Sequence, residues 1–128
     1  VLETLTIRKN VKTLSTRLFE LDSKLTTVTL PSTIENIGDY AFNKCFALSN
    51  VELPNGLISI GKFSLSNMNL KSITIPSTVT SIGNYAFYNN SNLTTIDDNS
   101  GLSTCSMVSS NTTINNKKNN TSLTCSAN

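Results

Sequence analysis

The side chains that could support catalysis or hold a metal are few in this 128-residue chain. It contains three cysteines, Cys45, Cys105 and Cys125, and no histidine. Histidine is the commonest general base and a frequent zinc ligand, so its absence removes most hydrolytic and zinc chemistry. Three scattered thiols without a CxxC pair do not match the spacing of a zinc site. The sequence therefore predicts no metal and no cofactor.

Carboxylates can work in pairs as general acid and base. Acidic residues such as Glu35, Asp39 and Glu52 are expected on different walls of the predicted fold, too far apart to work as a pair. No glycine-rich phosphate loop occurs. The chain is predicted not to be an enzyme. Its net charge of +2 comes from scattered basic residues, so nucleic acid is not expected as a partner. No apolar run approaches the roughly 20 residues that span a bilayer.

The cysteines have separate predicted roles. Cys45 replaces a core position of the repeat described next, where it would pack as a small apolar side chain. Cys105 and Cys125 could form a disulfide, whose chain-entropy contribution would be about 3 kcal/mol. Two free thiols in a reducing compartment are the alternative.

The elements that must position these residues come from an internal repeat. Leucines recur with spacings of 23, 23, 22 and 23 residues, and the second and fourth units, LTTVTLPSTIENIGDYAFNKCFA and LKSITIPSTVTSIGNYAFYNNSN, match column by column. The repeats begin at Leu2, Leu25, Leu48, Leu70 and Leu93. The array is predicted over residues 1–98, with an Asn/Ser/Thr-rich tail or cap over 99–128.

Each unit predicts a strand followed by turns. Val28 and Leu30 alternate with threonines, which is typical of a strand with one buried face, and one strand per repeat must give a parallel sheet. A proline ends each strand, a glycine follows in a turn where φ can be positive, and an apolar group then fills the core. These positions are Pro31, Pro54 and Pro76; Gly38, Gly61 and Gly83; and Phe42, Leu65 and Phe87. Short helical turns are predicted at Tyr40–Phe42 and Tyr85–Phe87, with Asp39 or Asn84 as caps.

The units at both ends depart from this pattern. In the first unit Arg8 replaces the proline, Ser15 the glycine and Arg17 the tyrosine. In the last unit Ile96 fits, but Asp98 occupies the slot of Leu30. Terminal repeats are commonly atypical because they have only one neighbour.

The pattern LxxIxIPxxVxxIGxxAFxxC resembles the BspA-like, or treponemal, class of leucine-rich repeats over about residues 1–98. The closing cysteine is kept only at Cys45, with Asp22, Met68 and Asn90 in its place elsewhere. The resemblance implies a right-handed, mainly β solenoid with a parallel concave sheet and short strands, turns and helical turns on its other walls. Such proteins are typically secreted or surface-anchored proteins of bacteria and protozoan parasites, and several are described as adhesins for host matrix proteins.

The outward strand positions form the predicted ligand-binding face, because solenoids bind partners on their concave surface. They form two ladders, Thr4, Thr27, Asn50 and Ser72, and Thr6, Thr29, Glu52 and Thr74, which continue to Thr95 and Asp97. The alternative is that threonine simply suits a strand. N-glycosylation acceptor patterns occur at Asn89, Asn92, Asn111, Asn119 and Asn120, with the tail sites favoured.

The sequence thus predicts an extracellular or cell-surface module that binds another macromolecule, such as a host matrix or cell-surface protein. The alternative is a structural protein that self-assembles end to end into a filament or surface layer. A chain that begins at Val1 without Met is expected to be a mature fragment or a piece of a longer protein.

Overall fold

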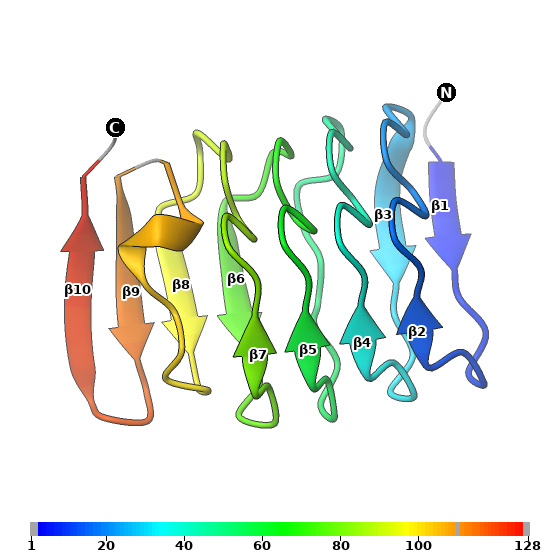
Figure 1. Cartoon of the computed structure of the whole chain (residues 1–128). Coiled ribbons are helices and arrows are strands. Elements are labelled where there is room, and N and C mark those ends of the chain that lie inside the picture. The colour runs from blue at the N-terminus through cyan, green and yellow to red at the C-terminus, as the bar shows by residue number, and fades with distance from the viewer. Residues whose placement is uncertain (1–2, 110, 127–128) are drawn as a thin grey trace.

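The computed structural model describes residues 3–109 and 111–126, and it is a β-solenoid (Figure 1). Each of the first four coils contributes a longer segment to one wall and a short strand to another. The N- and C-terminal coils lie at opposite ends of the stack (Figure 1). The longer strands are β1 (Glu3–Thr6), β3 (Leu25–Thr29), β6 (Ser72–Ile75), β8 (Thr95–Asp98), β9 (Thr112–Asn116) and β10 (Thr121–Cys125). The short strands are β2 (Thr13–Leu14), β4 (Asn36–Ile37), β5 (Ser59–Ile60) and β7 (Ser81–Ile82).

The longer strands form what we call the strand wall. β1 pairs with β3, and β6, β8, β9 and β10 form a second sheet in that order. All these pairs are parallel except β9–β10, which is an antiparallel hairpin. The strand wall therefore runs past residue 98 into the segment that the sequence had suggested as a tail or cap.

The short strands stack in parallel as β2-β4-β5-β7. Their register aligns one aliphatic side chain per coil, Leu14, Ile37, Ile60 and Ile82. Across the coil these face the apolar positions of the strand wall, such as Val28 and Ile73, and the interior is continuous from coil to coil. Each coil buries its apolar edge only by stacking on its neighbours.

The core contains the side chains predicted for it. Phe42, Leu65 and Phe87 are fully buried. Cys45 is buried and unpaired, as expected for a small apolar side chain in the core.

The third wall consists of tight turns, and the helical turns predicted for it are wrong. Tyr40 has φ 59° and Tyr85 has φ 58°, in the left-handed region that a right-handed helix excludes. The only helical element among the described residues is a 3-10 turn, η1 (Cys105–Met107). We call residues 15–22, 38–45, 61–68 and 83–90 the turn wall.

Left-handed residues let the turn wall form hydrogen bonds between coils. The N–H groups of Tyr40, Phe42 and Lys44 donate to the carbonyls of the next coil at 3.0, 2.8 and 3.1 Å. The first and third coils do the same from Arg17, Phe19 and Leu21 and from Phe63, Leu65 and Asn67. In these nine bonds the donor belongs to the earlier coil and the acceptor to the later one, whereas the N–H groups of Gly38, Gly61 and Gly83 donate to the preceding coil. Asp39 also differs from its predicted capping role, because its Oδ1 accepts from the Lys62 N–H of the next coil at 3.0 Å.

Glycine occupies the repeated positions Gly38 and Gly61 for a different physical reason from the positive φ that was predicted. The positive-φ glycines are Gly56 and Gly101, not Gly38 or Gly61. A Cβ on Gly38 would lie 2.6 Å from the Leu14 carbonyl oxygen, and one on Gly61 would lie 2.6 Å from the Asp39 nitrogen. Both neighbours belong to the preceding coil, so glycine is required for close approach of two backbones.

The third coil interrupts the strand wall. Ser49–Leu53 stands where the repeat predicts a strand, but it pairs with neither β3 nor β6 (Figure 1). Val51 nevertheless points into the core, with 3% of its surface exposed. The coil keeps its place through its core side chains and its other walls.

Candidate interaction surface

The predicted ligand-binding residues lie on the outer face of the strand wall. The register places Thr4 beside Thr27 and Thr6 beside Thr29. Further along, Ser72 lies beside Thr95 and Thr74 beside Asp97, and both ladders continue into β9 at Thr113 and Asn115. The eight residues predicted to bind a ligand are all exposed. Their geometry forms one polar surface, and their role in binding stays a prediction.

Two hollows flank the unpaired segment of the third coil. One, of about 370 Å³, lies between β3 and Ser49–Glu52 and includes Thr27 and Thr29. The other, of about 340 Å³, lies between Asn50–Leu53 and β6 and includes Ser72 and Thr74. Glu52 lines both. Six of the eight predicted residues therefore surround this break in the sheet.

The break leaves backbone groups available. No backbone N–H or C=O of Ser49–Leu53 has a hydrogen-bond partner among the described residues. In a parallel sheet, successive residues direct these groups to opposite neighbours. The Ile75 carbonyl accepts from Asn99 on the β8 side, so the groups of Thr74 face Ser49–Leu53. Unpaired backbone on a surface can receive the main chain or polar side chains of a partner.

The two ladders carry two carboxylates, Glu52 and Asp97. Asp97 accepts a hydrogen bond from Asn115 Nδ2 at 3.0 Å and lies 4.0 Å from Lys117 Nζ. Within the described part of the chain, Glu52 has neither an ion pair nor a hydrogen bond. Glu52 is thus the carboxylate of the ladders without an ionic partner, and its neighbours in them, Thr29 and Thr74, carry hydroxyl groups.

An aromatic column runs along the turn wall. The rings of Tyr40, Phe63 and Tyr85 stack with centroids 5.2 Å apart, and the Arg17 guanidinium covers the outer face of Tyr40 at 4.2 Å. The inner faces of the three rings cover one another, and Arg17 covers the outer face of Tyr40, whereas Tyr85, beyond Phe63, has an edge contact with Tyr88 and stays 44% exposed. This column stabilises the stack of coils.

A polar ladder runs beside the aromatic column. Asn89 Nδ2 donates to Asn67 Oδ1, Asn67 Nδ2 to Asn43 Oδ1, and Asn43 Nδ2 to Glu20 Oε2. A carboxylate only accepts, so Glu20 fixes the direction of the whole ladder. Hydrogen bonds from Asn43 and Arg17 lower the pKa of Glu20.

The glycosylation candidates differ in their surroundings. The side-chain amide of Asn89 is engaged in the polar ladder, and Asn92 Nδ2 donates to Asn69 Oδ1 at 2.9 Å. Asn119 and Asn120 lie in the exposed turn between β9 and β10. Asn111 is exposed just before β9. Modification of any of them stays a prediction, and the geometry favours the tail sites over the repeat sites.

A residue that the sequence showed only as a departure from the repeat is central to the packing. Asn90, which replaces the closing cysteine, is fully buried. Its Nδ2 donates to the carbonyls of Leu65 and Phe87, and its Oδ1 accepts from the N–H groups of Met68 and Leu70. In the sequence, the presence of Asn where the repeat has its closing cysteine was the signal that could have indicated this role.

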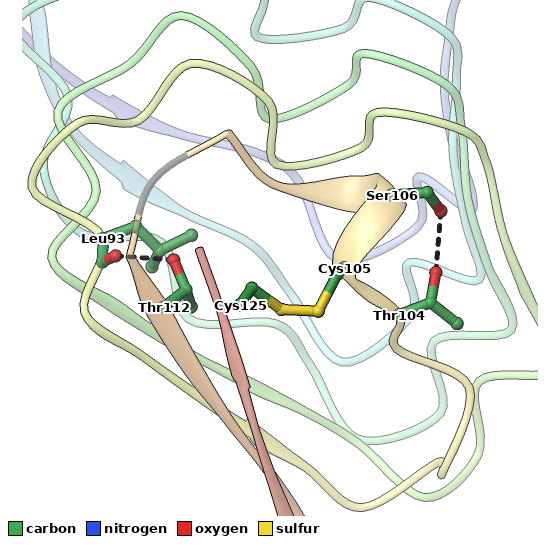
Figure 2. Close-up of a disulfide and its surroundings, with 6 residues drawn as sticks. All are labelled: Leu93, Thr104, Cys105, Ser106, Thr112 and Cys125. Carbon is green, nitrogen blue, oxygen red and sulfur yellow. Dashed lines mark hydrogen bonds between the residues drawn. A yellow bond between two sulfur atoms is a disulfide. The ribbon is translucent and has the colours of Figure 1, made fainter. Parts of the chain in front are cut away.

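The last coil is closed by a disulfide and a buried carboxylate. Cys105 of η1 and Cys125 at the end of β10 are bonded, which is the first of the two alternatives left by the sequence (Figure 2). Thr112 Oγ1 donates to the Leu93 carbonyl at 2.8 Å and ties β9 to the preceding coil (Figure 2). Asp98 accepts hydrogen bonds from the N–H groups of Ser100 and Ser103 at 2.9 and 2.8 Å.

In the described ranges, no group of three or more His, Cys, Asp and Glu side chains could hold a metal ion. Residues 3–109 and 111–126 also contain no helix of the length and apolar character that crossing a membrane requires.

Comparison with known families agrees with this geometry. A family model described as the BspA type leucine-rich repeat region matches residues 12–125 in six copies. The chain belongs to the BspA-type leucine-rich repeat family. The match extends through β9 and β10, as the strand wall does.

Solved structures of other proteins resemble this one. The pneumococcal vaccine antigen PcpA is 27% identical with a TM-score of 0.71, over 75% of this chain and 24% of that chain. A leucine-rich repeat protein from Bacteroides ovatus is 31% identical with a TM-score of 0.71, over 83% of this chain and 30% of that chain. The chain thus spans less than a third of either protein. No curated protein sequence matches.

Proposed function

We propose that this BspA-type solenoid is an extracellular or cell-surface recognition module that binds another protein through its strand wall. The observation that carries the proposal is the break at Ser49–Leu53, where unpaired backbone and the free Glu52 carboxylate meet between two hollows. A packed sheet without a break would offer only side chains.

The chemistry of the break favours an extended segment that carries Lys or Arg. Its cationic side chain would pair with Glu52, and its main chain would meet backbone groups and the hydroxyls of Thr29 and Thr74. No Lys or Arg side chain of the described residues forms an ion pair with Glu52, so its carboxylate is available to a cation of the partner.

The surface location is supported by the family and by one neighbour. PcpA is described as a vaccine antigen, and an antigen of that use must be accessible to antibodies. The disulfide also fits an oxidising compartment. Adhesion to a host matrix protein is the form of recognition that we propose.

The test uses a panel of purified matrix proteins immobilised for biolayer interferometry. Glu52→Lys reverses the central charge on an exposed position, and Glu35→Lys makes the same change away from the strand wall. We expect Glu52→Lys to weaken binding at least about tenfold, equivalent to about 1.4 kcal/mol, whereas Glu35→Lys leaves it unchanged. Binding should also weaken with rising salt.

Two results would overturn the proposal. One is the absence of binding to any protein of the panel at micromolar concentration. The other is binding that both charge reversals leave unchanged, because the strand wall would then not be the contact surface.

A further inference from the structure

β10 is the last strand of the strand wall, and among the described residues no other strand pairs with its outer edge (Figure 1). Proteins usually protect such an edge with lysine, proline, a bulge or a covering loop. The five residues of β10, TSLTC, contain no charge and no proline, and the register with β9 is continuous. This edge is unprotected.

The direction of its backbone groups follows from the neighbouring strand. The Thr113 N–H of β9 donates to the Thr94 carbonyl, toward β8. The adjacent Ile114 therefore faces β10, where it pairs with Leu123. Alternation along β10 then turns the N–H and C=O groups of Ser122 and Thr124 toward the open edge.

Leu123 has an incomplete environment. It shares a face with its partner Ile114, which is 2% exposed, yet Leu123 is 51% exposed. The core column of the strand wall thus ends in a half-covered leucine. An occupant of the edge must supply both a strand and an apolar side chain at this position.

We infer that the occupant is a second copy of this chain, paired antiparallel through β10 about a two-fold axis at Leu123. In that register Ser122 faces Thr124 of the partner, and these are the residues whose backbone groups point outward. Leu123 then faces its symmetry mate in a non-hydrogen-bonded pair, where side chains approach most closely. One register satisfies the backbone and covers the leucine, and no like charges within β10 oppose each other.

At the opposite end of the solenoid, the first coil obstructs another coil stacked in the same register. The glycine column of the turn wall begins with Ser15, and the small, fully buried column Ala41, Ser64 and Ala86 begins with Leu18, which is 48% exposed. On Gly38 a Cβ would lie 2.6 Å from the preceding coil, so the Cβ of Ser15 occupies the space that a coil stacked in this register would need. The larger Leu18 side chain adds to the obstruction.

The difference between the ends decides the type of assembly. A head-to-tail contact that repeats would give a filament, but it needs two complementary ends. Here one end is obstructed by Ser15 and Leu18, and the other is self-complementary. The structure therefore favours a closed dimer over the filament considered from the sequence, and the disulfide holds β10 in place for it (Figure 2).

The test is the mass in solution by light scattering after size exclusion, over a range of concentrations, for protein made without glycans and with the disulfide intact. We expect a shift with concentration from the 13.9 kDa chain to twice that mass. Ser122→Pro removes an outward N–H without touching the bonds to β9, and Leu123→Lys places like charges across the axis. Both variants should remain monomeric at concentrations that dimerise the wild type.

Ile58→Lys is the matched control, because Ile58 is 41% exposed on another wall. It should dimerise like the wild type. A Leu123→Cys variant should form a disulfide-linked dimer faster than Ser122→Cys, since only the first places two thiols on the axis. The proposal is overturned by a wild type that stays monomeric at millimolar concentration, by dimers that Ser122→Pro and Leu123→Lys do not affect, or by growth into polymers. None of these readouts depends on a ligand of the strand wall.

Discussion

Asn90 makes the same contact as Cys45, two coils apart. The Cys45 thiol donates to the Phe19 carbonyl at 3.1 Å, and Asn90 Nδ2 donates to the Leu65 carbonyl at 2.8 Å. Both acceptors occupy the same repeat position in the preceding coil's turn, the half-buried Phe19 and the fully buried Leu65. Asn adds bonds that a thiol cannot make, because its carbonyl oxygen also accepts two backbone N–H groups.

Asn90→Ala should lower the free energy of unfolding by about 3 kcal/mol or more, because it leaves several buried backbone groups unpaired. The measurement is urea unfolding followed by circular dichroism. Asn92→Ala removes an exposed hydrogen bond to Asn69 and should change the free energy of unfolding by less than about 0.5 kcal/mol. Equal effects of the two substitutions would contradict the role assigned to Asn90.

Ser64→Ala should stabilise the protein by about 1 kcal/mol. The Ser64 hydroxyl is buried without a hydrogen-bond partner, and its column neighbours Ala41 and Ala86 show that a methyl group fits there. Thermal unfolding should show a higher Tm. A lower Tm would mean that the hydroxyl contributes a bond that the structure does not show.

Cys45 should resist thiol reagents in the folded protein. Burial raises the pKa of the Cys45 thiol to about 11, so little thiolate forms near neutral pH. Titration with a chromogenic disulfide at pH 8 without reductant should detect almost no thiol in the native protein and one per chain in urea. Rapid reaction of the native protein would contradict the packing around Cys45.

Acid should weaken the last coil through Asp98. Although burial of the Asp98 carboxylate raises its pKa, hydrogen bonds from Ser100 and Ser103 outweigh it and hold the pKa below the ordinary value of 3.8. A depressed folded pKa contributes stability above pH 3.8 that is lost as pH falls through the folded value. Asp98→Asn should therefore be less stable than the wild type at pH 7, by about 1.5–3 kcal/mol, and the gap should narrow below pH 4.

Urea unfolding at pH 7 and pH 3 measures this difference. Glu52→Gln serves as the control for loss of an exposed carboxylate and should show no comparable gap at either pH. A gap between wild type and Asp98→Asn that is independent of pH would contradict the assignment.

Gly61→Ala should cost about 1–3 kcal/mol, because its Cβ would meet the Asp39 backbone of the preceding coil. Ser15→Ala lies in the same column of the first coil, and it should be neutral to within about 0.5 kcal/mol. Urea midpoints compare the two. If Gly61→Ala is as stable as the wild type, glycine is not required there for close approach of the two backbones. Ser15 would then not obstruct the stacking of another coil.

The strand columns and the core could be predicted from the sequence because they depend on one local rule. Apolar side chains alternate with threonine at Val28 and Leu30, and the repeat carries that pattern to every coil. The sequence of Tyr40–Phe42 is compatible with a helical turn as well as with the turn observed. The sequence alone does not show that Tyr40 donates its N–H to the next coil. The same holds for Gly38, whose neighbour is distant in sequence.

The break at Ser49–Leu53 could not be predicted, because Val51 and Leu53 keep the strand pattern while the ladder hydrogen bonds are absent. β9 and β10 could not be predicted either, because of their composition. Their Asn/Ser/Thr-rich sequence is typical of disorder, and Ile114 alone continues the core column in β9. The disulfide and the register with β8 supply the order that composition does not indicate.

Ten backbone N–H groups of the turn wall donate to the following coil, whereas those of Gly38, Gly61 and Gly83 donate to the preceding one, so the peptide dipoles of this wall do not cancel. Each peptide group carries a dipole of about 3.5 D, and aligned groups add, whereas a β-sheet has only a small net dipole. The carbonyl ends point to the N-terminal coil, which is therefore the negative pole. Residues 3–24 hold five basic and three acidic side chains, which account for the entire net charge of +2. Five of the ten basic side chains thus lie at the end of the solenoid where the dipoles of the turn wall favour positive charge, as cations do at the C-terminus of a helix.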